Sequence, residues 1–300
     1  MHESPPNATA YVDEKEFPVQ GPDEAWLRDT FALRHDLLDR QRRAYLEHRQ
    51  EIDPADEMWV GMVTNMPADQ KPWARLHYMY GGRSALRGMM GALVSAQAAL
   101  PRRILDFPCG HGRVTRFLRA AFPEAEIWAG DVNRPGVDFC VRHFGAQPLY
   151  SDVDLAKVRI GAKFDLVWCG SLATHLPEAA CRQLLGLLLD ALEPDGILGI
   201  TTCGRGMGWA QEHVFKTIRE EEYARIRRQW QETGFGYADY PGWPGYGMTF
   251  MDPSWLFREV FSREGYCVLG FDEKGWHGTQ DVLWVIRRPV SHWYHWSKDN

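Results

Sequence analysis

Short apolar runs alternate with amphipathic stretches through the middle of the chain. The apolar runs have strand length and occupy 104–107, 126–131, 147–152, 164–170 and 196–203. Patterns typical of helices separate them, at 113–122, 134–144 and 178–192. Strands that are buried on both faces read as continuous apolar runs, so this alternation predicts a doubly wound α/β domain with a mostly parallel sheet.

Two further apolar runs close the pattern, at 266–272 and 281–288. Only a short, turn-rich segment joins them, and strands with such a short connection pair antiparallel. They complete a predicted seven-stranded sheet whose last strand is antiparallel. We therefore assign the core domain to two segments, 96–205 and 264–290.

The region before the core is helical in pattern. Residues 1–20 carry few large apolar side chains and are predicted to be disordered. Residues 21–95 are interpreted as a helical N-terminal extension or cap. Within it we expect one helix over about 22–52, an irregular stretch over 53–82, and a second helix with Ser84 as its N-cap.

The alternation stops again between the two core segments, at 206–263. This segment contains a charged helix, a stretch rich in glycine and aromatic residues that is expected to be a loop, and a helix opened by Asp252 and Pro253. We interpret it as an inserted lid on the substrate side of the sheet. Its aromatic residues either line a pocket or simply pack on the domain: Trp209, Tyr240, Trp243, Tyr246 and Phe250.

Composition narrows the class of protein only mildly. The six cysteines form no C-x-x-C pair and are interpreted as reduced, buried thiols of a cytoplasmic protein. The N-terminus lacks the pattern of a secretory signal, and no apolar run reaches the roughly 20 residues that span a bilayer. A net charge of −6 disfavours a nucleic-acid partner, and we predict neither nucleic-acid nor membrane binding.

The sequence LDFPCGHGR, 105–113, has the form of a ligand-binding turn between a strand and a helix. A dinucleotide-binding turn requires G-x-G-x-x-G, and Thr115 stands where the third glycine belongs. In dinucleotide-binding folds, the strand before this turn normally carries only apolar residues. In this chain, Asp106 lies inside the strand before the turn. An NAD(P)-dependent oxidoreductase is therefore the weaker alternative.

The segment RILDFPCGHGRVTRFL resembles the first motif of class I S-adenosylmethionine-dependent methyltransferases, a strand followed by D/E-x-G-x-G-x-G and a helix. Asp106, Gly110 and Gly112 match this motif, and Pro108 replaces its first glycine. The resemblance implies S-adenosylmethionine as cofactor, bound by the turn that includes Cys109. Because proline fixes φ near −65°, we expect Pro108 to be extended and the two glycines to permit close approach.

The resemblance continues along the next two strands. Asp131 matches the family's acidic residue that binds the ribose hydroxyls, and Val132 and Asn133 follow it as further cofactor-binding candidates. Asp152, or less favourably Asp154, matches the residue that faces the adenine amino group. Each of these carboxylates taken alone would also suit an ordinary loop at a strand end.

The fourth strand and its continuation, FDLVWCGSLATHLP, also resemble the family and place the backbone of Gly170 and Ser171 beside the methionine moiety. His175 follows as the first candidate for a general base, with a helix-entry histidine as the plainer alternative. His111 and His213 are weaker candidates. In all, the resemblance covers 96–203 and 264–289.

The acceptor is less defined by the sequence. The fourth-strand segment has no D/N-P-P-Y/F motif, and no proline precedes Cys169, so methylation of nucleic-acid bases is not indicated. We predict transfer to an oxygen, or a nitrogen, of a small-molecule or sugar-like acceptor. A non-catalytic binding or assembly module with the same fold is the alternative. Tyr78, Tyr80 and Arg83 are candidates for contact with the cofactor carboxylate, and no metal site is predicted, since the His292–His295 pair has no companion ligands.

Overall fold

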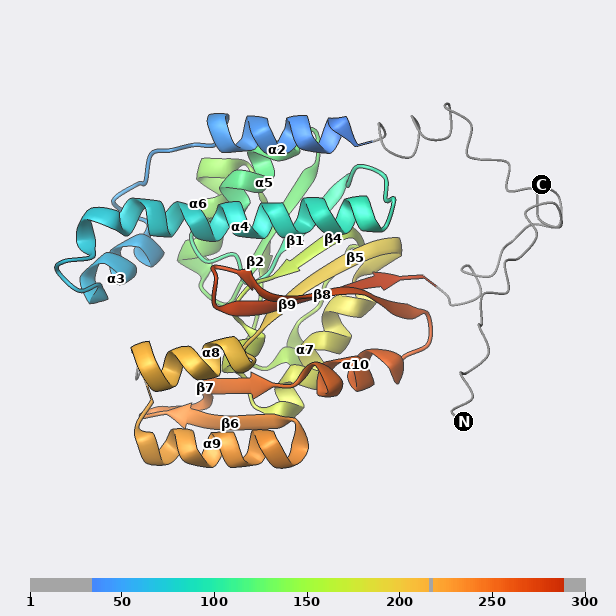
Figure 1. The fold of residues 1–300 in the computed structure, drawn as a ribbon. Coiled ribbons are helices and arrows are strands. Elements are labelled where there is room, and N and C mark those ends of the chain that lie inside the picture. The colour runs from blue at the N-terminus through green and yellow to red at the C-terminus, as the bar shows by residue number, and fades with distance from the viewer. Residues whose placement is uncertain (1–33, 216–217, 289–300) are drawn as a thin grey trace, which may run out of the picture.

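The computed structural model describes residues 34–215 and 218–288, and its centre is a seven-stranded sheet (Figure 1). The strand order is β3–β2–β1–β4–β5–β9–β8. Only β9 runs against the other strands, and it lies between β5 and the edge strand β8. The predicted doubly wound sheet with an antiparallel last strand is confirmed. The strands are β1 Arg103–Asp106, β2 Glu126–Asp131, β3 Gln147–Tyr150, β4 Phe164–Cys169, β5 Leu192–Thr202, β8 Tyr266–Trp276 and β9 Gln280–Arg287.

Helices cover both faces of this sheet because its strands are apolar on both sides. Ile104 points to the face covered by α4 and α5, whereas Leu105 points to the face covered by α7 and α10. Helix α6 packs against Ala129 of β2. The predicted core helices are present with shifts of one or two residues at their ends. The covering helices are α4 Ala74–Ser95, α5 Thr115–Ala121, α6 Arg134–Phe144, α7 Glu178–Asp190 and α10 Pro253–Phe261.

The N-terminal extension is more helical than the sequence predicted. Residues 53–82 are not irregular: they contain α3, Glu57–Asn65, and the first turns of α4. Ser84 is therefore not an N-cap; it is buried inside α4, and its Oγ donates to the carbonyl of Gly81. Gly81 and Gly82 lie inside α4, and a Cβ on Gly82 would lie 2.2 Å from the ring of Phe117. These glycines serve close helix packing instead of ending a helix.

The first helix of the extension is shorter than expected. Helix α2 spans His35–Glu47, while 22–33 and the predicted disordered segment 1–20 lie outside the described residues. Helix α2 is held against the core by Arg40, which donates to the carbonyl of Ala121 at the end of α5. Figure 1 shows α2 and α4 side by side above the sheet.

The glycine- and aromatic-rich stretch of the insertion is a β-hairpin, so the prediction of a loop was wrong. Strands β6, Phe235–Tyr240, and β7, Trp243–Met251, pair antiparallel and turn at Gly242, whose φ is +80°. Gly247 makes the pairing possible, because a Cβ there would lie 1.8 Å from the carbonyl oxygen of Ala238. Figure 1 shows the hairpin beside α8, Arg205–Ala210, with α9, Glu220–Thr233, on its outer side.

The six cysteines are all free; Cys267 is half-buried and the others are buried, which agrees with the predicted reduced thiols. In the described part of the chain, no helix is both long and apolar enough to cross a membrane. Within the same residues, no group of three or more histidine, cysteine and acidic side chains is arranged to hold a metal ion. His292 and His295 lie outside the described part.

Candidate functional site

A cavity of about 1040 Å³ opens where β1, β2, β3 and β4 end. Crevices at this edge are where open α/β sheets bind their ligands, and the volume is at the upper end of the range for such sites. The turn of the β6–β7 hairpin and Met58 of α3 complete its wall. Most of the residues predicted from the sequence border it together: Pro108, Cys109, Gly110, Asp131, Val132, Asp152, Gly170, Ser171 and His175.

Asp131 joins the ends of two neighbouring strands. One of its carboxylate oxygens accepts a hydrogen bond from the backbone N–H of Gly110 at 2.8 Å, and the other accepts from the N–H of Asn133 at 2.9 Å. The side chain is buried yet borders the cavity. Each carboxylate oxygen keeps a free lone pair, so the group can still accept two hydrogen bonds from a ligand.

Three predicted cofactor-binding residues, Asp106, Gly112 and Asn133, do not border the cavity and instead support its walls. Asp106 is buried and accepts a 2.7 Å hydrogen bond from the hydroxyl of Thr115, the first residue of α5. Burial, assisted by the charge of Asp131, raises the pKa of Asp106 to about 7. Asn133 caps α6 by accepting from the N–H of Gly136.

The two glycines of the glycine turn adopt backbone conformations that favour glycine. Gly110 and Gly112 both have positive φ, +51° and +77°. A Cβ on Gly110 would lie 2.0 Å from Cε of Met58, whereas a Cβ on Gly112 would strike the ring of Phe144. Gly110 therefore faces the cavity and Gly112 faces α6. The Phe107–Pro108 peptide bond is cis, a feature that the sequence did not predict.

His175 lies at the other side of the cavity, in a short 3₁₀ turn, Ala173–His175, after β4. Its Nδ1 lies 2.9 Å from the carbonyl oxygen of Gly247 in β7, and because a carbonyl only accepts, Nδ1 carries the proton. The neutral ring therefore has its lone pair on Nε2. Burial lowers the pKa of His175, and the ring stacks on Tyr246 at 4.8 Å.

The remaining histidine candidates do not border the cavity. His111 is buried against Phe139 and lies 3.8 Å from Glu57, and His213 stacks on Trp209 at the surface. Among the aromatic residues of the insertion, Trp243 and Tyr246 line the cavity, whereas Phe250 is buried beneath the hairpin. The aromatic residues of the hairpin turn thus line a pocket, as one interpretation of the sequence expected. Phe250, at the base of the hairpin, packs on the domain instead, as the alternative expected.

The residues suggested for the cofactor carboxylate lie elsewhere, because α4 begins ten residues before the predicted N-cap. The hydroxyl of Tyr78 donates to Asp56 at 2.6 Å beneath the cavity wall, and Arg83 lies over the ring of Tyr45. Tyr80 also does not border the cavity.

Sequence reasoning missed several residues that do border the cavity. Arg113 follows the glycine turn directly, and its adjacency to Gly112 was the only signal for it. Met58 and Trp276 come from α3 and the end of β8, far from the turn in sequence. No local pattern marks these two, since tertiary packing alone brings them to the sheet edge.

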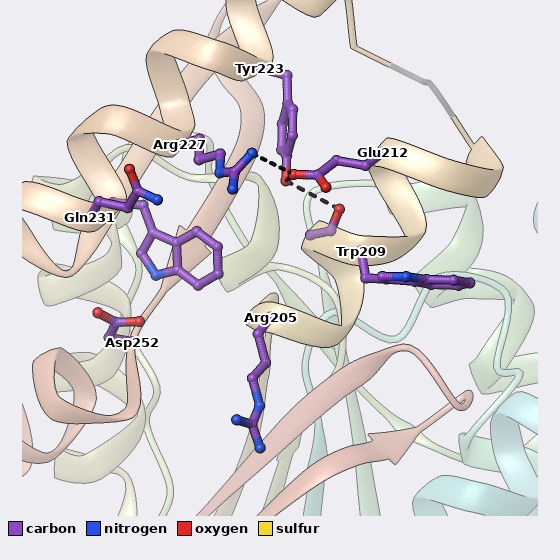
Figure 2. A pocket seen from close by; sticks show the side chains of 9 residues that line it. Arg205, Trp209, Glu212, Tyr223, Arg227, Gln231 and Asp252 are labelled. Atoms are coloured by element: carbon purple, nitrogen blue, oxygen red, sulfur yellow. Dashed lines mark hydrogen bonds and ion pairs between the residues drawn. The ribbon is translucent and has the colours of Figure 1, made fainter.

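A second cavity, of about 410 Å³, lies on the insertion between α8 and α9, and Figure 2 shows its lining. Several of its charged groups are already paired. Glu212 forms a 3.1 Å ion pair with Arg227 and accepts a hydrogen bond from Tyr223, while Arg205 pairs with Glu273. This cavity therefore offers a ligand few unpaired groups, in contrast to the cavity at the sheet edge.

Comparison with known proteins finds similarity over part of the chain. Residues 104–196 match the sequence profile of a family described as "Methyltransferase domain". This segment carries the glycine turn, Asp131 and the fourth strand. About a third of the chain is therefore similar to methyltransferase domains.

Two curated proteins are similar over part of their length. Trans-aconitate 2-methyltransferase of Methylobacterium nodulans is 28% identical over 128 residues, 43% of this chain and 48% of that protein. Malonyl-[acyl-carrier protein] O-methyltransferase of Acetivibrio thermocellus is 28% identical over 120 residues, 39% of this chain and 41% of that protein. The match thus spans less than half the length of either relative.

Solved structures of methyltransferases are also similar. An S-adenosylmethionine-dependent methyltransferase from Clostridium acetobutylicum has a TM-score of 0.49 at 13% identity, covering 74% of this chain and 96% of that one. Magnesium protoporphyrin IX methyltransferase from Synechocystis, solved with S-adenosylhomocysteine, has a TM-score of 0.47 at 16% identity, covering 88% and 100%.

Proposed function

We propose that this protein is an S-adenosylmethionine-dependent methyltransferase that acts on an oxygen, or a nitrogen, of a small-molecule acceptor. One observation carries the proposal: Asp131 accepts a hydrogen bond from the backbone N–H of Gly110 in the glycine turn and still borders a large cavity, within the segment that matches the methyltransferase family. The malonyl relative is named as an O-methyltransferase, which favours oxygen.

The residues at the ends of β1 to β4 fit the cofactor. Asp131 would accept hydrogen bonds from the ribose hydroxyls, and Asp152 would face the adenine. Gly110 brings the backbone of the turn to the cavity, where the cofactor's amino-acid portion would pass, and Met58 packs against it. When bound, S-adenosylmethionine would supply a methyl group activated by its sulfonium. We call the cavity wall formed by Gly110, Asp131, Asp152 and Gly170 the donor half.

The opposite wall, formed by His175, Trp243 and Tyr246, we call the acceptor half. His175 would accept the proton of the acceptor at Nε2, since Nδ1 is fixed by the carbonyl of Gly247. The lowered pKa keeps the ring neutral at pH 7, which is the form a base requires. Trp243 and Tyr246 provide apolar surface around the acceptor and help to exclude water.

Calorimetric titration with S-adenosylmethionine and S-adenosylhomocysteine tests the proposal. We expect both to bind, and binding of neither at high micromolar concentration, or binding of NAD(P) instead, would overturn it. A turnover screen with a broad acceptor panel then separates an enzyme from a non-catalytic module, which would bind the cofactor without transferring its methyl group.

Replacing Asp131 tests the donor half. Asp131→Ala removes the acceptor for the ribose hydroxyls and should weaken S-adenosylhomocysteine binding by about 1–3 kcal/mol. Asp138→Ala is the matched control, because Asp138 lies on the nearby α6, accepts from Tyr150 and does not border the cavity. Unchanged affinity in the Asp131 variant would remove this residue from the site.

A further inference from the structure

Arg113 is a cation in the cavity wall without a counter-ion. Its Nε is buried and has no hydrogen-bond partner. Among the residues that the structure describes, no carboxylate, carbonyl or hydroxyl is hydrogen-bonded to its guanidinium, and none forms an ion pair with it. Because buried charges in proteins are normally paired and hydrogen-bonded, this arginine stands out as a group that a ligand would satisfy.

The neighbouring arginines of the same helix region are held by hydrogen bonds, although Nε of Arg116 also lacks a partner. Arg116 donates to the carbonyls of Arg49 and Glu51 and lies 3.4 Å from Asp56. Arg119 donates to several carbonyls, beginning with Phe144 at 2.9 Å. These two residues anchor structure, and Arg113 is the one of the three that borders the cavity.

The surroundings of Arg113 contain aromatic rings, and the carboxylates of Asp106 and Asp56 attract it without forming an ion pair with it. The guanidinium lies 5.3 Å from the ring of Trp276 and 5.9 Å from that of Tyr78. Nε2 of His277 is also buried without a partner, and burial beside Arg113 lowers the pKa of His277 to about 3. Desolvation likewise lowers the pKa of Arg113, although arginine stays protonated at neutral pH.

The place of Arg113 in the cavity separates it from the predicted adenosine contacts. Asp131 and Asp152 follow β2 and β3, on one side of β1. Trp276, over which Arg113 lies, packs on the other side, where a Cβ on Gly170 would lie 3.3 Å from its ring. The guanidinium therefore stands beyond the glycine turn, at the end of the cavity where β4 stops.

We propose that Arg113 binds a carboxylate of the ligand that fills this cavity, an assignment that rests on the proposed methyltransferase function. A planar guanidinium pairs with a carboxylate through two parallel hydrogen bonds, and its partial desolvation strengthens that pairing. The carboxylate belongs either to the methionine portion of the donor or to an acidic acceptor. In both cases the arginine pairs with a carboxylate. The two cases differ in whether the donor or the acceptor loses affinity when Arg113 is replaced.

The test is calorimetry on the whole chain with S-adenosylhomocysteine and with its decarboxylated analogue. If the donor supplies the carboxylate, Arg113→Met should lower the affinity for S-adenosylhomocysteine by roughly 10- to 100-fold and leave the analogue unaffected. If an acceptor supplies it, the affinity for S-adenosylhomocysteine should stay the same. In wild-type protein, carboxylic acids should then inhibit methyl transfer more strongly than the corresponding amides. The variant should lose this preference for the acids by a similar factor.

Two control variants keep the outcome clear. Arg134→Met removes a positive charge that stacks on Tyr150 outside the cavity and should change neither preference. Arg113→Lys keeps the charge but loses the planar fork, so it should keep part of the affinity that Arg113→Met loses. It replaces Arg113→Met as the test variant if that variant folds poorly. If wild-type protein binds S-adenosylhomocysteine but Arg113→Met keeps both carboxylate preferences, the role of Arg113 is overturned; if wild-type protein binds no cofactor, the proposed function fails first.

Discussion

The two walls of the cavity are built by different means. The donor half consists of backbone amides, glycines and carboxylates at the ends of neighbouring parallel strands, all within 104–170. The acceptor half depends on a hairpin from the insertion, which reaches His175 through the carbonyl of Gly247, 72 residues away in sequence. One wall is thus local in the chain, whereas the other exists only once the insertion has packed against the core.

This difference has a functional meaning. The donor half is tied into the sheet by Asp131 and Asp106, so its shape is fixed by the fold itself. The acceptor half is formed by side chains on a turn, and the tip residue Trp243 is exposed. Loops and turns on a rigid scaffold tolerate sequence change, so we expect acceptor choice to vary among similar proteins while the donor half stays the same.

The sharpest way to separate the two halves is His175→Gln. It removes the proposed base but keeps a side chain of similar length, so the turnover number should fall about 100- to 10,000-fold. The affinity for S-adenosylhomocysteine should not change. His213→Gln is the control, since its ring stacks on Trp209 outside the cavity. Full activity in the His175 variant would contradict its role as base.

The wild-type rate should also report the pKa of His175. Because burial lowers that pKa below the ordinary value of 6.5, the imidazole stays neutral through pH 7. The turnover number should therefore be level near neutral pH and fall only as the pH drops through the lowered pKa. A fall that begins above pH 6.5 would show that another group titrates.

The second test concerns the buried carboxyl beneath the donor half. The pKa of Asp106 in the folded protein, about 7, lies above its ordinary 3.8, so the folded state holds this proton more tightly than the unfolded chain. The resulting stability is present at low pH and is lost as the pH rises through 7. Asp106→Asn should remove roughly 2–4 kcal/mol of this pH dependence between pH 4 and 8, measured by denaturant unfolding. Identical pH profiles for variant and wild type would show that Asp106 ionises normally.

The smallest effect is expected from filling the contact between α6 and the glycine turn. A Cβ on Gly136 would lie 2.5 Å from the carbonyl oxygen of Gly110, so Gly136→Ala should push the helix away from the turn. We expect a loss of about 1–3 kcal/mol in unfolding free energy and weaker cofactor binding. In Gly61→Ala, on α3, the new Cβ meets no atom within 4 Å, and the variant should be slightly more stable. Equal behaviour of the two alanine variants would refute the close contact.

Much of the fold followed from the sequence because its signals are local. Fully apolar runs separated by amphipathic helices define a two-sided parallel sheet, and the structure has that sheet. The extension and the insertion were predicted less well, for a related reason. Residues 53–82 were expected to be irregular and the glycine-rich stretch of 234–247 to be a loop, yet Gly82 and Gly247 permit close approach to Phe117 and to Ala238. A glycine that allows tight packing has the same local sequence signature as one that ends an element.

The sequence by itself determined the sheet, the glycine turn and the carboxylates of the donor half, because each of these is set by residues adjacent along the chain. Only the tertiary structure decided which of them face the cavity, turning Asp106 and Gly112 toward the interior and Asp131 toward the cavity. It also brought Met58, Trp276 and the hairpin to the same edge and left Arg113 without a partner there. Those arrangements depend on packing between segments distant in sequence, and no local pattern encodes them.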